Sequence, residues 1–346
     1  MSLFHRGPHS RRSMNPADGI VAFWHWWATE GADECAGALA AGLPESVAPA
    51  LAAAVEGIYP ELSWELAPGT TSEHRLVVTA AGDPQLRATA RRWLRAAPPP
   101  DAVWAYTDSR PAEQDMTWTL VVDDHEVSAS DVAVSWTEAS ASLDVVVHHP
   151  VLAVLSEQVR DQLAFLLLDH ALGETAVETW IGTINSQVSD SASPTSDLGA
   201  LRAAVEELAS RYAQQTWVLM EALTPTGQRL IAAAQRPLRP TTAPHLDQHL
   251  QAELPFIEQA NGGLPGPRSL QLLREVENQL ANQLGDDGRL VAHQTSGGVR
   301  TLHIYTDSTT DAADRANALL AGWPEGRPRI RVTPDPGWHA VRHLRG

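Results

Sequence analysis

The sequence predicts an α+β protein with two antiparallel-sheet domains and helices packed on one face of each sheet. Segments of alternating apolar and polar residues are interleaved with segments of helical periodicity. Gly297-Gly298 separates two strand-like segments, as in a tight hairpin. The length of 346 residues corresponds to roughly two domains of about 150 residues each. Together these observations predict two sheet domains.

The first half begins with helices and continues with strands. Residues 17–58 predict two helices, and the first carries Phe23, Trp24, Trp26 and Trp27 over an arc wider than a usual apolar stripe. Some of these rings should therefore meet a second surface, either the second domain or a ligand. Alternation predicts six strands, at residues 62–66, 74–79, 103–106, 116–122, 132–136 and 143–147.

The second half follows a Ser-rich segment that lacks periodicity, residues 186–197. A helix at 198–212 and strands at 217–223 and 229–233 come next. The remaining elements are predicted as strand, helix, strand, strand, helix, strand, at residues 248–256, 268–284, 289–295, 299–306, 309–321 and 328–333. This order is that of the ferredoxin-like split βαβ unit.

These patterns divide the chain into a flexible tail, two domains and a linker. We place them at residues 1–16 (tail), 17–185 (acidic α+β domain), 186–197 (linker) and 198–346 (ferredoxin-like domain). Residues 62–107 and 289–333 share the order strand, strand, helix, strand, with similar residues at the helix starts. We therefore expect a duplicated ferredoxin-like half; the alternative is that any two such segments look alike.

Several segments of the last third resemble a known bacterial family, the domain of unknown function 695, over residues 216–344. The segments are Gly263-Leu264-Pro265, the helix with Leu270, Leu273, Glu277 and Leu280, the Gly297-Gly298 hairpin, Leu302-His303-Ile304-Tyr305 and Asp335-Pro336-Gly337-Trp338. The resemblance implies a ferredoxin-like fold similar to that of ribonuclease E regulator proteins. It carries no activity and no binding residue over to this chain, and it does not reach the first half.

Composition excludes several classes of function. All 25 basic residues are Arg, and the net charge of −17 repels nucleic acid, so we expect no direct nucleic-acid binding by the first domain. No run of about 18 apolar residues is present, which predicts a cytoplasmic protein without a membrane span. The single cysteine, Cys35, allows no intramolecular disulfide and is expected to be a small buried residue.

The acid excess lies mainly between residues 96 and 178, where fifteen acids face two arginines. Strands in this stretch alternate, so the acids should collect on one exposed face. Such a face is either a device for solubility or a docking surface for a basic protein. We expect a non-enzymatic binding or regulatory protein whose partner binds at five of these acids, Asp123, Asp124, Glu126, Asp131 and Glu138.

A metal-dependent enzyme or metal-binding protein is the alternative. His148 and His149 close a strand, and Asp169 and Glu174 lie near the end of the following helix, so these four side chains suit a hard or borderline metal. Spacings of four also occur at His245/His249 and His339/His343, but neither pair has the glutamate of a zincin motif. No ligand set is complete in spacing, and we predict no tightly held metal or organic cofactor.

Overall fold

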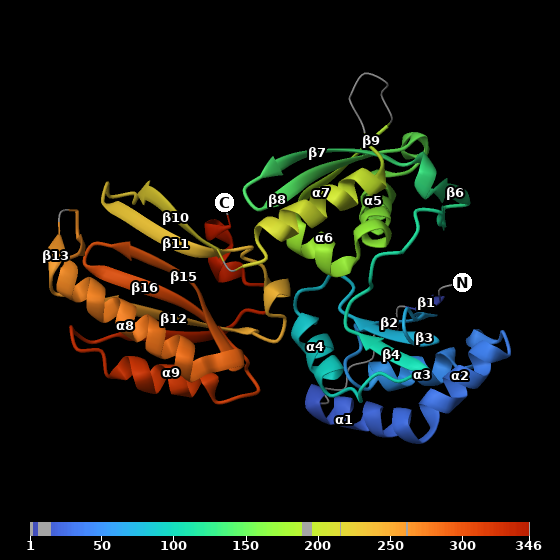
Figure 1. Cartoon of the computed structure of the whole chain (residues 1–346), viewed down its shortest axis with the longest axis horizontal. Coiled ribbons are helices and arrows are strands. Elements are labelled where there is room, and N and C mark those ends of the chain that lie inside the picture. Colours follow the sequence, from blue (N-terminus) through green and yellow to red (C-terminus); the bar gives the residue numbers. More distant parts are fainter. Residues whose placement is uncertain (1–2, 6–14, 189–195, 215, 261, 346) are drawn as a thin grey trace. The chain divides into compact units, whose positions relative to one another are not determined.

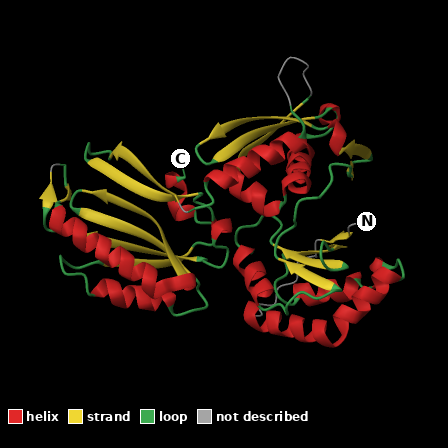
Figure 2. Cartoon of the chain, in the orientation of Figure 1, coloured by secondary structure: helices red, strands yellow, loops and turns green. Residues whose placement is uncertain are grey.

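The computed structural model describes residues 3–5, 15–188, 196–214, 216–260 and 262–345 (Figure 1). Helices and strands are both abundant, which confirms the α+β class (Figure 2). The chain divides into two compact units. Unit 1 contains residues 1–118 and 165–178, and unit 2 contains residues 119–164 and 179–346. Residues 189–195 of the predicted linker and most of the predicted tail lie outside the described residues.

Unit 1 is a four-stranded sheet, ordered β1-β2-β3-β4, with helices on one face. Its strands are β1 (Leu3–His5), β2 (Ser63–Pro68), β3 (His74–Thr79) and β4 (Trp104–Thr107). The helical elements between β1 and β2 are α1 (Pro16–Trp26), a π-helical turn η1 (Trp27–Gly31), α2 (Ala32–Ala40), η2 (Pro44–Ser46) and α3 (Ala48–Glu56). Helix α4 (Arg87–Arg95) joins β3 to β4. Strands β3 and β4 are parallel neighbours, as expected for a helical crossover.

The aromatic residues of α1 belong to the core of this unit. Phe23 and Trp27 are buried. The Trp24 ring stacks on Trp93 of α4, with centroids 5.0 Å apart, and Trp27 meets Trp104 of β4 edge-on at 4.9 Å. The wide aromatic arc is therefore explained by two contacts inside unit 1, whereas the sequence had suggested a second domain or a ligand.

The first half forms more sheets than the single ferredoxin-like sheet that we predicted for it. Besides the sheet of unit 1, it contains the hairpin β5 (Thr119–Val122) and β6 (His125–Ser128), and the sheet of β7 (Ala133–Ala139), β8 (Ser142–His148) and β9 (Ile181–Gln187). The connecting elements are η3 (Ala129–Asp131), η4 (Pro150–Ala153), α5 (Glu157–Leu172) and α6 (Glu174–Trp180). Helix α5 begins in unit 2 and ends in unit 1.

The last part of unit 2 follows α7 (Leu198–Arg211) and is a six-stranded sheet, ordered β10-β11-β15-β16-β12-β17. Its strands are β10 (Thr216–Leu223), β11 (Arg229–Arg236), β12 (Gln248–Pro255), β15 (Gly288–Ser296), β16 (Val299–Thr306) and β17 (Arg329–Pro334). Helices α8 (Pro267–Leu284) and α9 (Ala312–Ala321) cover one face, as Figure 1 shows. Shorter elements are η5 (Pro240–Thr242), the β13 (Gln259–Ala260) and β14 (Leu264–Pro265) pair, η6 (Gly285–Asp287) and η7 (His339–Leu344).

The predicted order strand, helix, strand, strand, helix, strand is present from β12 to β17. Both segments of the expected repeat contain two adjacent antiparallel strands followed by a helix. They differ after the helix. Strand β4 pairs directly with β3, whereas β12 lies between β16 and β17. The common order is therefore confirmed at the level of elements, and the sheet neighbours are not equivalent.

Three glycines explain part of the sequence pattern of this sheet. Gly297 and Gly298 have φ of 56° and 80° in the β15–β16 turn, a left-handed conformation that glycine adopts without steric cost. Gly263, also with positive φ, accepts a hydrogen bond from the Gly298 N–H at 3.0 Å. A Cβ at Gly263 would approach the Gly297 Cα to 3.1 Å, so a side chain at position 263 would crowd the backbone of the turn.

Candidate functional site

Four of the five predicted docking residues lie on the β5–β6 hairpin and on η3, which follows it. Asp123 and Asp124 form the two-residue turn, with φ of 47° and 63°, and Glu126 lies on β6. Asp131 ends η3. All four are exposed, and none of them is ion-paired within the part of the chain that the structure describes. We call these four residues the acidic hairpin.

Glu138, the fifth predicted residue, is exposed on β7 but is neutralised. Arg211 of α7 donates two hydrogen bonds to it, from Nη1 to Oε1 at 2.9 Å and from Nη2 to Oε2 at 2.7 Å. These charge-assisted bonds lower the pKa of the Glu138 carboxyl. Glu138 therefore adds little to the negative field that a partner would meet.

A buried cluster of arginines and carboxylates lies in unit 1 and joins β2, α4, the segment after β4, and the α5–α6 region. Its members are Glu65, Arg87, Arg91, Asp108, Arg110, Asp169, Glu174 and Glu178, which we call the arginine–carboxylate cluster. Arg110 bridges two acids, with Nε 2.9 Å from Glu65 Oε2 and Nη1 3.0 Å from Asp169 Oδ2. Arg87 pairs with Glu174 and Glu178, and Arg91 Nε lies 2.8 Å from Asp108 Oδ2.

Both oxygens of Glu174 are engaged in this cluster. Oε1 accepts from Arg87 Nη2 at 3.2 Å and from the Gly82 N–H at 3.3 Å. Oε2 accepts from the Arg110 N–H at 3.0 Å and from the Thr79 hydroxyl. The side chain is 1% exposed, so it serves as an internal anchor and has no oxygen free for a metal or a substrate.

Asp169 has a different environment. Its Oδ2 is held by Arg110, but its Oδ1 is buried and has no hydrogen-bond partner among the described residues. Burial, together with the negative charges of Glu174 and Glu178, raises the pKa of Asp169 to about 7. The cluster has five acids and three arginines, so uptake of a proton by Asp169 offsets part of a buried negative charge.

His148 and His149, the other half of the predicted metal set, belong to unit 2, whereas Asp169 and Glu174 belong to unit 1. His148 Nε2 is 3.0 Å from Ser135 Oγ of the neighbouring strand. His149 Nδ1 accepts the Val151 N–H at 3.1 Å and so caps η4, and burial lowers the pKa of this imidazole. Among the residues described, no group of three or more His, Cys, Asp or Glu side chains is arranged to hold a metal ion.

The histidines of the other two spacings make separate contacts. His245 Nε2 is 2.8 Å from the Asp286 carbonyl oxygen, whereas His249 Nε2 is 3.1 Å from His303 Nδ1 on the adjacent strand. Burial lowers the pKa of His303 to about 3, so this imidazole is neutral at physiological pH. Residues His339 and His343 lie on η7. His245 and His249 are thus occupied with separate contacts.

The Asp335-Pro336-Gly337-Trp338 motif packs the end of the chain onto the sheet. Asp335 accepts the Tyr305 hydroxyl at 2.6 Å and the N–H groups of His339 and Ala340 at 2.8 and 2.9 Å. The Trp338 ring stacks on Tyr305 at 4.4 Å. This motif therefore closes the sheet face opposite α8 and α9 and supports the core.

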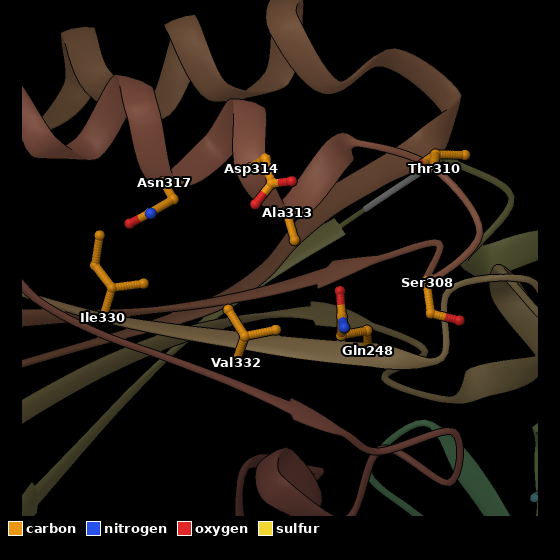
Figure 3. A pocket seen from close by; sticks show the side chains of 8 residues that line it. All are labelled: Gln248, Ser308, Thr310, Ala313, Asp314, Asn317, Ile330 and Val332. Atoms are coloured by element: carbon orange, nitrogen blue, oxygen red, sulfur yellow. The ribbon is translucent and has the colours of Figure 1, made fainter.

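A groove lies between α9 and the strands at the β17 edge (Figure 3). Its volume is about 380 Å³, and it is lined by Gln248, Ser308, Thr310, Ala313, Asp314, Asn317, Ile330 and Val332. In Figure 3, Asp314 and Asn317 extend from the helix toward β17, the strand that carries Ile330 and Val332. The hydroxyls of Ser308 and Thr310 bond to Asp247 and to the Asp307 carbonyl, so they hold the loop in place.

A second groove, of about 540 Å³, opens where α8 leaves the sheet uncovered near β10 and β11. Trp217 of β10 and His293 of β15 line it, with rings stacked at 5.9 Å. Burial and the nearby Arg300 charge lower the pKa of His293 to about 4. Trp217 is not among the predicted site residues, although its position at the start of a predicted strand is visible in the sequence.

Comparison with known families identifies one part of the chain. Residues 230–343 match the model described as "Family of unknown function (DUF695)". The DUF695 match confirms the resemblance in the last third, although it begins at β11 and leaves β10 outside. It spans the sheet from β11 to β17, both covering helices and most of η7. No curated protein matches the chain. No helix in the described part is long and apolar enough to cross a membrane.

Proposed function

We propose that this chain is a non-enzymatic binding or regulatory protein that docks a basic protein partner through the acidic hairpin. The observation that carries the proposal is the exposure of four acids within nine residues without a compensating arginine in the described chain. Like charges held together repel one another, and a basic partner would offset that cost. Val121, 68% exposed on β5, offers apolar contact beside the charges.

The alternative enzyme is less well supported. Glu174 is saturated by four hydrogen bonds, and Asp169 is ion-paired to Arg110. His149 caps a helical turn through its Nδ1. Three of the four residues suggested for metal or acid–base chemistry thus have partners that explain why they are present, and the proposal of a binding protein does not need them.

The test compares two sets of four substitutions with the same change in charge. The first neutralises the acidic hairpin (D123N/D124N/E126Q/D131N). The control neutralises four exposed acids of unit 1 (E30Q/D33N/E34Q/E45Q). A partner is first recovered from lysate of the native host with the wild-type chain. The affinity of that partner for the wild type and for each of the two variants is then measured at about 50 to 300 mM salt, a range over which the screening of charges increases.

The hairpin variant should bind about tenfold or more weakly than wild type at low salt, because four favourable charge contacts are lost. Its affinity should also respond less to salt. The control variant should keep the wild-type affinity. Equal weakening in the two variants, or none in either, would reject the docking surface and leave the acids as a contribution to solubility.

A further inference from the structure

The two edges of the six-stranded sheet differ in a way that points to a partner. Strand β17 forms one edge. It carries two charged residues, Arg329 and Arg331, and Pro334, which has no backbone N–H. Natural sheets use these features to prevent pairing with another strand. Strand β10 forms the other edge. Its sequence, TWVLMEAL, contains no proline and one charged residue, Glu221.

The β10 edge is long, regular and apolar. It pairs with β11 over eight consecutive residues without a register shift. Trp217, Leu219 and Leu223 lie on the face that α8 and α9 cover elsewhere, and they are 41%, 71% and 72% exposed. Figure 1 shows β10 and β11 extending past both helices. An edge of this kind is a template for another strand.

We propose that β10 pairs antiparallel with β10 of a second copy of this chain, forming a dimer through a continuous sheet. Antiparallel pairing of a strand with itself is closed by a two-fold axis, so both copies use the same surface. With Met220 on the axis, Trp217 lies opposite the partner subunit's Leu223, and Val218 opposite the partner subunit's Ala222. Aromatic–aliphatic pairs of this kind stabilise neighbouring strands.

The other registers with the same faces aligned are less favourable. A shift by two residues in one direction places Glu221 opposite the partner subunit's Glu221, and like charges directly opposite one another destabilise a sheet. A shift in the other direction places Trp217 opposite the partner subunit's Glu221 and leaves Leu223 beyond the paired strand. In the register centred on Met220, Glu221 lies opposite the partner subunit's Leu219. This register therefore keeps the two glutamates apart and pairs Trp217 with Leu223.

Charge also favours a second copy as the occupant. Residues 191–346 contain 16 acids and 15 arginines, a net charge of −1, whereas residues 1–190 contain 26 acids and 10 arginines, a net charge of −16. The surface that would meet itself thus belongs to the nearly neutral part of the chain. Glu221, its one charge, is already paired with Arg229, with Nε 2.6 Å from Oε1.

Mass measurement on the full chain tests the dimer. Multi-angle light scattering over a concentration series should give twice the 37.4 kDa of one chain, about 75 kDa, at high concentration. L219D, which places an acid directly opposite the partner subunit's Glu221, should remain monomeric at every concentration, because like charges opposite one another destabilise a sheet. I257D is the matched control, since Ile257 is 74% exposed outside β10, and it should dimerise like wild type.

Cysteine cross-linking tests the register. In a C35A background, M220C should form a disulfide-linked dimer under mild oxidation, because residues opposite each other in antiparallel strands have Cα atoms about 4.5–5.5 Å apart. L223C, although more exposed, should not, because the two cysteines would lie about 20 Å apart along the strands. A wild-type chain that stays monomeric, or cross-linking of L223C in preference to M220C, would overturn the proposal; circular dichroism confirms that each variant is folded.

Discussion

In the arginine–carboxylate cluster, burial disfavours the charged form of each carboxylate, whereas pairing with arginine favours it. Glu65 and Asp169 share Arg110, and both carboxylates are nearly inaccessible to solvent. Sequence spacing does not predict these contacts, since Arg110 and Asp169 are separated by 59 residues. The sequence did place Asp169 and Glu174 near the end of α5, and the dipole disfavours acids at the C-terminal end of a helix. The cluster accounts for that placement through the arginines of α4 and Arg110.

The raised pKa of Asp169 predicts a pH dependence of stability. The folded chain keeps a proton on Asp169 up to about pH 7, whereas the unfolded chain loses it near pH 4. The folded state therefore binds more protons between these values, and this contribution to the free energy of unfolding falls as pH rises through 7. D169N removes the titration, so its stability should decline less steeply between pH 4.5 and 7.5, by up to about 1.4 kcal/mol per pH unit.

Urea denaturation at a series of pH values measures this slope. D161N is a suitable control, because Asp161 is exposed on the same helix. Its slope should follow that of wild type. If D169N and wild type give parallel curves, Asp169 does not titrate in this range and the account of its environment is wrong.

Asp335 is predicted to be the most sensitive acid of the DUF695 sheet. D335A would leave the buried Tyr305 hydroxyl without its acceptor and would uncap η7, at a cost of about 2–4 kcal/mol in the free energy of unfolding. Y305F removes one hydrogen bond and keeps the cap, so it should cost only about 1 kcal/mol. Urea midpoints of the two variants check the order; a larger loss for Y305F would contradict this role of Asp335.

At the scale of elements, local patterns predicted local structure. The alternation of β16, the length of α8 and the Gly297-Gly298 turn are visible in the sequence, and the structure confirms each. Sheet membership was harder to predict. Strand β9 pairs in parallel with β8 across two intervening helices, and β12 inserts between β16 and β17. These pairings depend on contacts between distant segments, about which a local pattern carries no information.

The β15–β16 turn provides a test at this scale. G298A should cost about 1–2 kcal/mol, because alanine disfavours a φ of 80° and its Cβ would clash with the Gln259 amide. G297N should be nearly neutral, because asparagine tolerates this conformation and Asn-Gly is a favoured turn. Thermal unfolding of both variants measures the difference in stability. Equal midpoints would show that the left-handed conformation of the turn does not require glycine at position 298.

For the molecule as a whole, counting charges overestimated the acidic surface. Of the fifteen acids between residues 96 and 178, Asp108, Asp169, Glu174 and Glu178 pair with arginines of unit 1, and Glu138 pairs with Arg211. Of the other ten, Glu113 Oε1 lies 3.9 Å from His170 Nδ1, and four make up the acidic hairpin. The charge that a partner could meet is thus smaller than the count suggests, and part of it is concentrated at one hairpin.

The absence of lysine makes a direct test of the docking surface possible. All 25 basic side chains are arginine, so within the chain no lysine side chain can react with a carboxylate that has been activated by a carbodiimide. Cross-links between these carboxylates and lysines therefore come from a partner. Complexes captured from lysate of the native host are treated with carbodiimide, and the linked residues are identified by mass spectrometry.

The account predicts that cross-links to the partner concentrate at Asp123, Asp124, Glu126 and Asp131, and that they disappear when salt is raised before the reagent is added. Cross-links spread in proportion to exposure over all acids, or concentrated at the exposed unit 1 residues Glu30, Asp33 and Glu34, would contradict the docking surface.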